Sequence, residues 1–161
     1  MPKVVVIYDS QTGNTEKMAK AVVDGVRMVE MVEVELLKVG TPFSISKLKN
    51  ANAIILGSPS RYGSITAEMK EFLEAVKEHK DSKKLEFSRK VGGVFGSYAW
   101  DGGWVTDKLE ADVKALGIRI VTSAVSAVDQ MGVMGTRIDE ASLKRCRELG
   151  RFVAEKASAA D

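Results

Sequence analysis

An unbroken apolar run near the start of the chain constrains the fold more than any other sequence feature. The run Val4–Ile7 is β-branched and ends at Tyr8, which is typical of a strand buried on both faces of a parallel sheet. A polar loop over residues 9–15 follows, and a helical pattern of apolar residues begins around Glu16. The first strand therefore leads through a polar loop into the N-terminus of a helix.

This loop is suited to binding an anion. The first N–H groups of a helix have no intrahelical partner and lie at the positive end of its dipole, so they attract a phosphate. Gly13 lets the backbone approach an anion closely or adopt a positive φ. Hydrogen-bonding side chains crowd the same loop: Ser10, Thr12, Asn14 and Thr15. The alternative is that Ser10 and Thr12 only cap the helix. Because four such side chains exceed what a cap needs, we predict a phosphate site.

Two nucleotide-binding motifs are absent from this loop, and their absence limits which phosphate compound it could bind. Neither the dinucleotide fingerprint G-x-G-x-x-G nor the ATP-binding motif G-x-x-x-x-G-K-[ST] follows the strand. No lysine lies between Val4 and Glu16 to contact a β- or γ-phosphate. Neutral hydroxyls and amides suit a monophosphate, so the sequence predicts a mononucleotide cofactor.

Length and composition indicate a single globular domain over residues 1–161. The hydrophobic fraction is 45% and the charged fraction 29%, which is typical of globular proteins. A net charge of +2 gives no argument for nucleic acid, and the apolar runs are far shorter than the roughly 20 residues of a membrane span. Cys146 is the only cysteine, which excludes an internal disulfide and a cysteine metal cluster. Because the chain enters a strand at once and leaves no room for a signal peptide, we expect a cytoplasmic protein without a metal site.

Strands and helices alternate along the rest of the chain. Further strands are predicted over residues 32–36, 53–56, 90–95 and 118–127. Helices are predicted over residues 16–29, 44–50, 66–80, 103–116 and 139–157, with Thr66 as an N-cap. Such a series predicts an α/β fold with a parallel sheet, right-handed crossovers and helices on both faces. Ligands of such sheets lie beyond the carboxyl ends of the strands.

Two later loops, at the ends of the third and fourth predicted strands, carry unusual aromatic residues. Residues 57–64 and 96–104 hold both tryptophans and two of the three tyrosines of the chain. Large aromatic side chains in loops leave apolar area in water, and a flat conjugated ligand stacked on them explains their presence. For Trp104 and Tyr98, packing into the core beneath the loop is an alternative. For Trp100 a ligand is the better explanation, because Asp101, Gly102 and Gly103 follow it.

The three loops together resemble those of the flavodoxin superfamily, whose cofactor is FMN. Ser10–Thr15 resembles the phosphate-binding loop. Gly57–Ser64 is similar to the second flavin loop of flavodoxin-like quinone reductases, and Phe95–Gly103 resembles the third flavin loop in the flavodoxin domain of flavodiiron proteins. The resemblance covers essentially the whole chain. It implies a flavodoxin-like three-layer sandwich with a five-stranded parallel sheet in order 2-1-3-4-5, of the short-chain type because the fifth strand continues to Val128 without a long interrupting loop.

The resemblance also implies a role for individual residues. The first loop binds the phosphate, the second lies along one side of the isoalloxazine with Gly63 near flavin N5, and the third borders the other face and the pyrimidine edge. The cofactor-binding residues so implied are Ser10, Gln11, Thr12, Gly13, Asn14, Thr15, Ser58, Pro59, Ser60, Arg61, Tyr62, Gly63, Ser97, Tyr98, Trp100, Gly102 and Gly103.

Two functions remain open on these residues. The chain offers no acid–base pair or nucleophile, and its one histidine, His79, lies on a charged helix end, so the flavin performs the chemistry and the protein tunes it. An FMN-binding electron carrier that docks to redox partner proteins through the exposed flavin edge is favoured, because the compact chain lacks an insertion for a substrate pocket. The alternative is an FMN-dependent NAD(P)H or deazaflavin oxidoreductase that reduces quinones. Its support is the near-neutral charge and Arg61, which either stabilises reduced flavin near N1 or lies in solvent. Homo-oligomerisation is left open.

Overall fold

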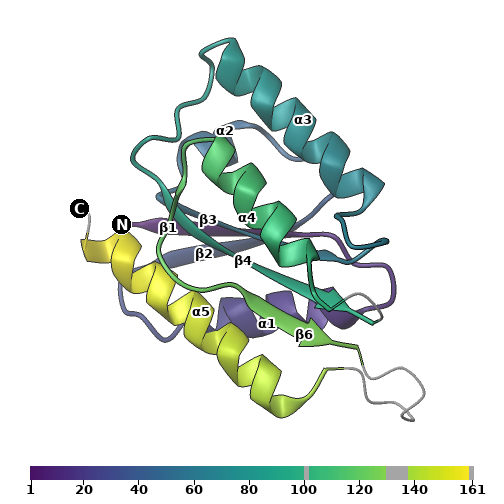
Figure 1. Cartoon of the computed structure of the whole chain (residues 1–161). Helices are drawn as coiled ribbons and strands as arrows, with labels where there is room; N and C mark the ends of the chain where they lie inside the picture. Colours follow the sequence, from purple (N-terminus) through teal and green to yellow (C-terminus); the bar gives the residue numbers. More distant parts are fainter. Residues whose placement is uncertain (100–101, 130–137, 160–161) are drawn as a thin grey trace.

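The computed structural model describes residues 1–99, 102–129 and 138–159 and shows an α/β sandwich (Figure 1). Strands and helices alternate as predicted from the sequence, except that two strands follow one another before the last helix. The strands are β1 (Lys3–Tyr8), β2 (Glu33–Lys38), β3 (Ala53–Pro59), β4 (Val91–Tyr98), β5 (Arg119–Ile120) and β6 (Val125–Val128). The helices are α1 (Asn14–Val26), α2 (Ser46–Lys49), α3 (Ala67–Asp81), α4 (Val105–Ala115) and α5 (Glu140–Ala159).

A parallel sheet forms the middle layer in the order β2-β1-β3-β4-β5, and β6 also pairs with β4. This confirms the predicted fold class and strand order. Helices α1 and α5 cover one face of the sheet, and α3 and α4 cover the other (Figure 1). The two faces of β1 show how the sequence builds both layers: Val4 and Val6 belong to the core beneath α1 and α5, whereas Val5 and Ile7 belong to the opposite core. Successive side chains of a strand point to opposite faces, so a continuous apolar run fills both cores.

The prediction of one continuous strand over residues 118–127 was wrong. In the structure β5 pairs with Val91 and Gly92, and β6 pairs with Phe95–Tyr98. The four residues 121–124 therefore face only Gly93 and Val94 on β4. The Val121 amide still donates to the Gly92 carbonyl at 3.1 Å, and residues 122–124 belong to neither strand. This segment lies at the sheet edge, where no outer strand enforces the register, and it includes the polar residues Thr122 and Ser123. An edge strand tolerates such an insertion because one side of it makes no ladder hydrogen bonds.

The predicted N-cap of α3 is confirmed, whereas α1 begins earlier than predicted. Thr66 is the N-cap of α3, and its side chain accepts a hydrogen bond from the Met69 amide at 3.1 Å. Helix α1 begins at Asn14, two residues before the predicted start, and its N-cap is Gly13 at φ 100° with no capping side chain. The start of α1 therefore keeps its first N–H groups available to a ligand.

Candidate functional site

The three predicted loops meet at the carboxyl ends of β1, β3, β4 and β6. They enclose a cavity of about 670 Å³, a volume in the range of small-molecule and cofactor sites. Its lining comes from the first loop, the second loop, the third loop and the end of β6: Gln11, Thr12, Asn14, Pro59, Ser60, Arg61, Tyr62, Ser97, Tyr98, Ala99 and Asp129. The other predicted residues within the described ranges do not line the cavity: Ser10, Gly13, Thr15, Ser58, Gly63, Gly102 and Gly103. Trp100 lies outside the described residues.

The first loop is arranged around the start of α1. The Ser10 hydroxyl accepts a hydrogen bond from the Gly13 amide at 3.1 Å, and the Asn14 side-chain amide donates to the Thr12 hydroxyl at 3.3 Å. Neither Ser10 nor Thr12 caps α1, because Gly13 occupies the N-cap. Thr15 is buried, and its hydroxyl is 2.9 Å from that of Ser97. This bond ties the first loop to the third.

A buried carboxylate joins the first loop to the start of α3. Asp9 is only 5% exposed, accepts a hydrogen bond from the Ser10 amide at 2.9 Å and accepts another from the Thr66 hydroxyl. Thr66 in turn caps α3. Sequence reasoning missed Asp9, although an acidic residue directly after a buried strand is an unusual position for a charge. Asp9 fixes the relative positions of the first loop and the start of α3.

The second loop contains a tight turn with an unusual backbone. Arg61 and Ser64 exchange two backbone hydrogen bonds of 2.8 and 3.0 Å, and the residues between them, Tyr62 and Gly63, have φ values of 53° and 82°. Positive φ at both central positions is the geometry of a type I′ turn, which favours Asn-Gly rather than a tyrosine. Such strain in a tyrosine is most often found at functional sites. The turn holds the fully exposed Tyr62 at the cavity rim.

Arg61, beside this turn, is exposed and belongs to none of the ion pairs among the described residues. The second loop is attached to the third by the Ser60 amide, which donates to the Ser97 carbonyl at 2.8 Å. Arg61 therefore lines the cavity as a cation without a carboxylate partner among the described residues.

The third loop turns closely over the sheet edge. Gly103 has φ 88°, and a Cβ atom there would lie 2.3 Å from the Ser126 hydroxyl, so only glycine fits. Tyr98 is half-buried and lines the cavity. Trp104 is 63% exposed and packs beside Gly63, outside the cavity lining. The alternative that Trp104 packs into the core was therefore wrong.

Two buried polar atoms in the described ranges have no hydrogen-bond partner, and both lie near the third loop. They are the Ser126 hydroxyl and the Oδ1 atom of Asp129. Asp129 follows β6 directly and lines the cavity. Sequence reasoning missed both residues, because strand periodicity predicts which residues are buried but not which ligand approaches the strand end.

Among the described residues there is no metal-binding cluster, no membrane-spanning helix and no reactive cysteine. No group of three or more histidine, cysteine, aspartate or glutamate side chains that could hold a metal occurs in the ranges 1–99, 102–129 and 138–159. None of the helices in these ranges is long and apolar enough to cross a membrane. Burial raises the pKa of the Cys146 thiol to about 12, so this cysteine is unreactive near neutral pH.

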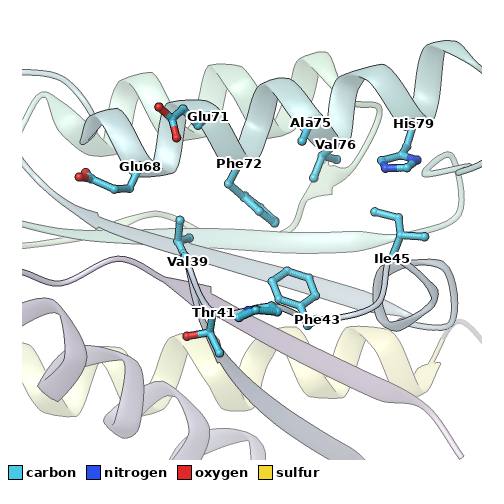
Figure 2. A pocket seen from close by; sticks show the side chains of 12 residues that line it. Val39, Thr41, Phe43, Ile45, Glu68, Glu71, Phe72, Ala75, Val76 and His79 are labelled. Carbon is cyan, nitrogen blue, oxygen red and sulfur yellow. The ribbon is translucent and has the colours of Figure 1, made fainter.

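A second hollow of about 510 Å³ lies between α3 and the segment that follows β2 (Figure 2). The rings of Phe43 and Phe72 approach to a centroid distance of 5.9 Å within it, and Glu68 and Glu71 lie toward one end. No predicted cofactor-binding residue lines this hollow, so the candidate site remains the cavity between the three loops.

Comparison with known families identifies the family to which this fold and these loops belong. A family model described as Flavodoxin matches residues 6–150. The chain belongs to the flavodoxin family. The predicted resemblance is confirmed, and so is the predicted cofactor, since FMN is the cofactor of this family.

Relatives of this flavodoxin family member differ in function. The chain is 31% identical to a flavodoxin of Aquifex aeolicus over 166 residues, covering 96% of this chain and 86% of the relative. It is 32% identical over 157 residues to a nitric oxide reductase of Moorella thermoacetica, covering 96% of this chain and 36% of the relative. It is 33% identical over 120 residues to an NAD(P)H dehydrogenase (quinone) of Archaeoglobus fulgidus, covering 60% and 62% of the two chains.

A similar solved structure is the rubredoxin oxygen:oxidoreductase of Desulfovibrio gigas. Its TM-score is 0.83 at 25% identity, covering 98% of this chain and 36% of that protein. The chain thus spans only about a third of the length of the two longer relatives, and most of the flavodoxin of Aquifex aeolicus.

Proposed function

We propose that this protein is an FMN-binding electron-transfer protein that passes electrons between redox partners. One observation carries the proposal: apart from Asp129, every lining residue of the cavity belongs to one of the three flavin loops. Among the described residues, no other helix, strand or loop adds a compartment to the cavity in which a second substrate could bind. A protein of this shape exchanges electrons through the exposed part of its cofactor.

The residues of the cavity fit FMN. The start of α1 offers N–H groups without a capping side chain, which suits the phosphate. We assign the phosphate to Ser10–Thr15, one side of the ring to Ser58–Gly63, and the other side to residues 97–103. Once bound, FMN supplies the redox chemistry by taking up or releasing one or two electrons.

The chain's own residues orient and tune the cofactor. The Thr15–Ser97 and Ser60–Ser97 bonds hold the three loops together, and the Asp9 carboxylate ties the first loop to the start of α3. Arg61 supplies a positive charge at the cavity, which favours the more negative, reduced state of a bound flavin. Redox partner proteins then approach the side of the cavity where Tyr62 is exposed.

Reconstitution and rapid kinetics test the proposal. The protein should bind one FMN per chain and discriminate against FAD, because the loop provides for a single phosphate. In stopped-flow mixing with NADH or NADPH, an electron carrier shows no rapid flavin bleaching unless a partner reductase is added. Rapid bleaching by the nucleotide alone contradicts the carrier function.

The second candidate is an FMN-dependent NAD(P)H or deazaflavin oxidoreductase that reduces quinones. It is favoured by the similarity to an NAD(P)H dehydrogenase (quinone) and by Arg61, which has no ion-pair partner within residues 1–99, 102–129 and 138–159 and is available to an anionic donor or acceptor. Rapid bleaching by NADH or NADPH followed by reoxidation with a quinone supports this candidate. The same pair of mixing experiments thus separates the two functions.

A further inference from the structure

A hollow apart from the cofactor cavity lies between α3 and residues 39–45 (Figure 2). Its volume of about 510 Å³ is in the range of small-molecule sites. None of the described residues lines both this hollow and the cavity between the three loops. The flank of α3 forms one wall, and the segment that follows β2 forms the other. A ligand in this hollow therefore occupies a site of its own, beyond the proposed FMN function.

The wall opposite α3 is held in place by backbone hydrogen bonds. At its start, the Val39 amide donates to the Tyr8 carbonyl of β1 at 2.8 Å. At its end, the Ile45 carbonyl accepts a hydrogen bond from the Leu48 amide of α2 at 3.0 Å. Gly40 has φ 91°, a conformation that favours glycine. Because the segment is attached at both ends, the hollow exists before a ligand binds, and binding needs little ordering of the chain.

Two aromatic rings meet across the hollow. Four lining residues of α3 recur at spacings of four, three and four positions, and so lie on one flank of the helix: Glu68, Phe72, Ala75 and His79. From this flank the Phe72 ring points toward Phe43 on the opposite wall, with a centroid distance of 5.9 Å (Figure 2). Both side chains are half-buried, so each keeps part of its ring surface accessible. The face of an aromatic ring attracts a cation.

One end of the hollow carries an uncompensated negative charge. The Glu68 and Glu71 carboxylates lie toward this end, whereas His79 lies toward the other (Figure 2). Both glutamates are exposed, and neither belongs to an ion pair within residues 1–99, 102–129 and 138–159. No lysine or arginine occurs among the described residues that line the hollow, although the net charge of the chain is +2. The unpaired carboxylates and the aromatic faces are independent features, and both favour a cation.

We propose that this hollow binds a small organic cation that carries an apolar group, of the arylalkylammonium class. The ammonium lies between the Glu68 and Glu71 carboxylates and the Phe72 ring. The apolar group packs against Phe43 and Ile45. An organic anion is repelled by the two carboxylates, and a neutral molecule of the same shape gains only the apolar contacts. A hydrated metal ion gains nothing from the apolar walls.

Three probes of similar shape and different charge test the proposal: phenethylammonium, phenethyl alcohol and hydrocinnamate. Dissociation constants are measured from shifts of the backbone amide signals in NMR titrations, on the protein as isolated and after loading with FMN. The ammonium should bind about 5- to 30-fold more tightly than the alcohol, as expected for exposed ion pairs combined with a cation–π contact. Hydrocinnamate should bind most weakly. The signals that shift should belong to residues 39–45 and 68–79.

Paired substitutions on α3 separate the two carboxylates of the hollow from the general charge of the surface. The double variant Glu68→Gln, Glu71→Gln should reduce the preference for the ammonium over the alcohol to below about threefold. The matched control is Glu74→Gln, Glu78→Gln, which removes the same charge from the same helix outside the hollow and should leave the preference nearly unchanged. Phe72→Leu keeps an apolar side chain without an aromatic ring and should lower the preference about two- to fivefold.

Several results overturn the proposal. Equal binding of the ammonium and the alcohol by the wild type means that the hollow does not select charge. An equal loss of preference in the control variant assigns the effect to the overall field of the protein. Absence of binding by all three probes, or shifts confined to residues 10–15, also contradicts the proposal. None of these results bears on the proposed FMN function, which is judged separately by flavin binding and stopped-flow kinetics.

Discussion

The Asp9–Thr66 pair offers the sharpest test of how the site is held together. Thr66 makes two hydrogen bonds through one hydroxyl: it donates to the buried Asp9 carboxylate and accepts from the Met69 amide as the N-cap of α3. The substitution Thr66→Val keeps the shape of the side chain and removes both bonds. It also leaves one oxygen of Asp9 buried without this donor.

The magnitude follows from the two lost interactions. Loss of an N-cap costs about 0.5–2 kcal/mol, and a hydrogen bond to a charged group contributes about 1.5–3 kcal/mol. Because the two bonds share one atom, the losses overlap, and we expect the free energy of unfolding to fall by about 2–4 kcal/mol. For a chain of this length each kcal/mol lowers Tm by about 2–4 °C, so the expected decrease in Tm is about 4–16 °C.

Thermal unfolding of the cofactor-free protein measures this effect. Thr106→Val is the matched control, since Thr106 is also buried near a helix start but its hydroxyl donates only to the Gly103 carbonyl. Thr66→Ser should recover most of the stability because it restores the hydroxyl. The reasoning is refuted if Thr66→Val is no less stable than Thr106→Val, or if Thr66→Ser is as unstable as Thr66→Val.

Four further predictions concern the cofactor loops and the core. The double substitution of Thr12 and Thr15 by valine should weaken FMN binding at least about tenfold by removing two hydroxyls, and unchanged affinity in a titration rules out the phosphate assignment. Arg61→Ala should make the second reduction potential more negative with little change in oxidised FMN affinity, whereas an unmoved potential in spectroelectrochemistry places Arg61 in solvent. Tyr62→Gly should raise stability in urea unfolding, or leave it unchanged, because relief of about 1–2 kcal/mol of positive-φ strain offsets the flexibility of glycine; marked destabilisation means that the tyrosine ring is needed for packing. The pKa of the Cys146 thiol rises from 9.0 to about 12 on folding, so the unfolded chain loses this proton first and stability should fall between pH 9 and 12. This slope should be shallower in Cys146→Ala, and equal slopes in both proteins contradict the assignment.

Local sequence determined the elements of this protein and the loops that line its candidate site. The apolar run that ends at Tyr8, the donors around Gly13 and the N-cap at Thr66 each depend on neighbours within a few residues, so periodicity and capping rules recover them. The phosphate-loop pattern and the aromatic second and third loops were sufficient to predict the flavodoxin family and FMN. These features are properties of short segments, so they can be recognised without knowledge of the fold.

Only the tertiary structure decided the features that depend on strand pairing and on contacts between distant loops. The break between β5 and β6 arises because four edge residues face two on β4, and no local pattern in residues 118–127 records that mismatch. Trp104 is exposed because the third loop places it beside Gly63 rather than over the core. Asp9 acquires its role from Thr66, which lies far along the chain at the start of α3. A sequence specifies which side chains are present at each strand end, whereas the pairing of strands determines which of them meet.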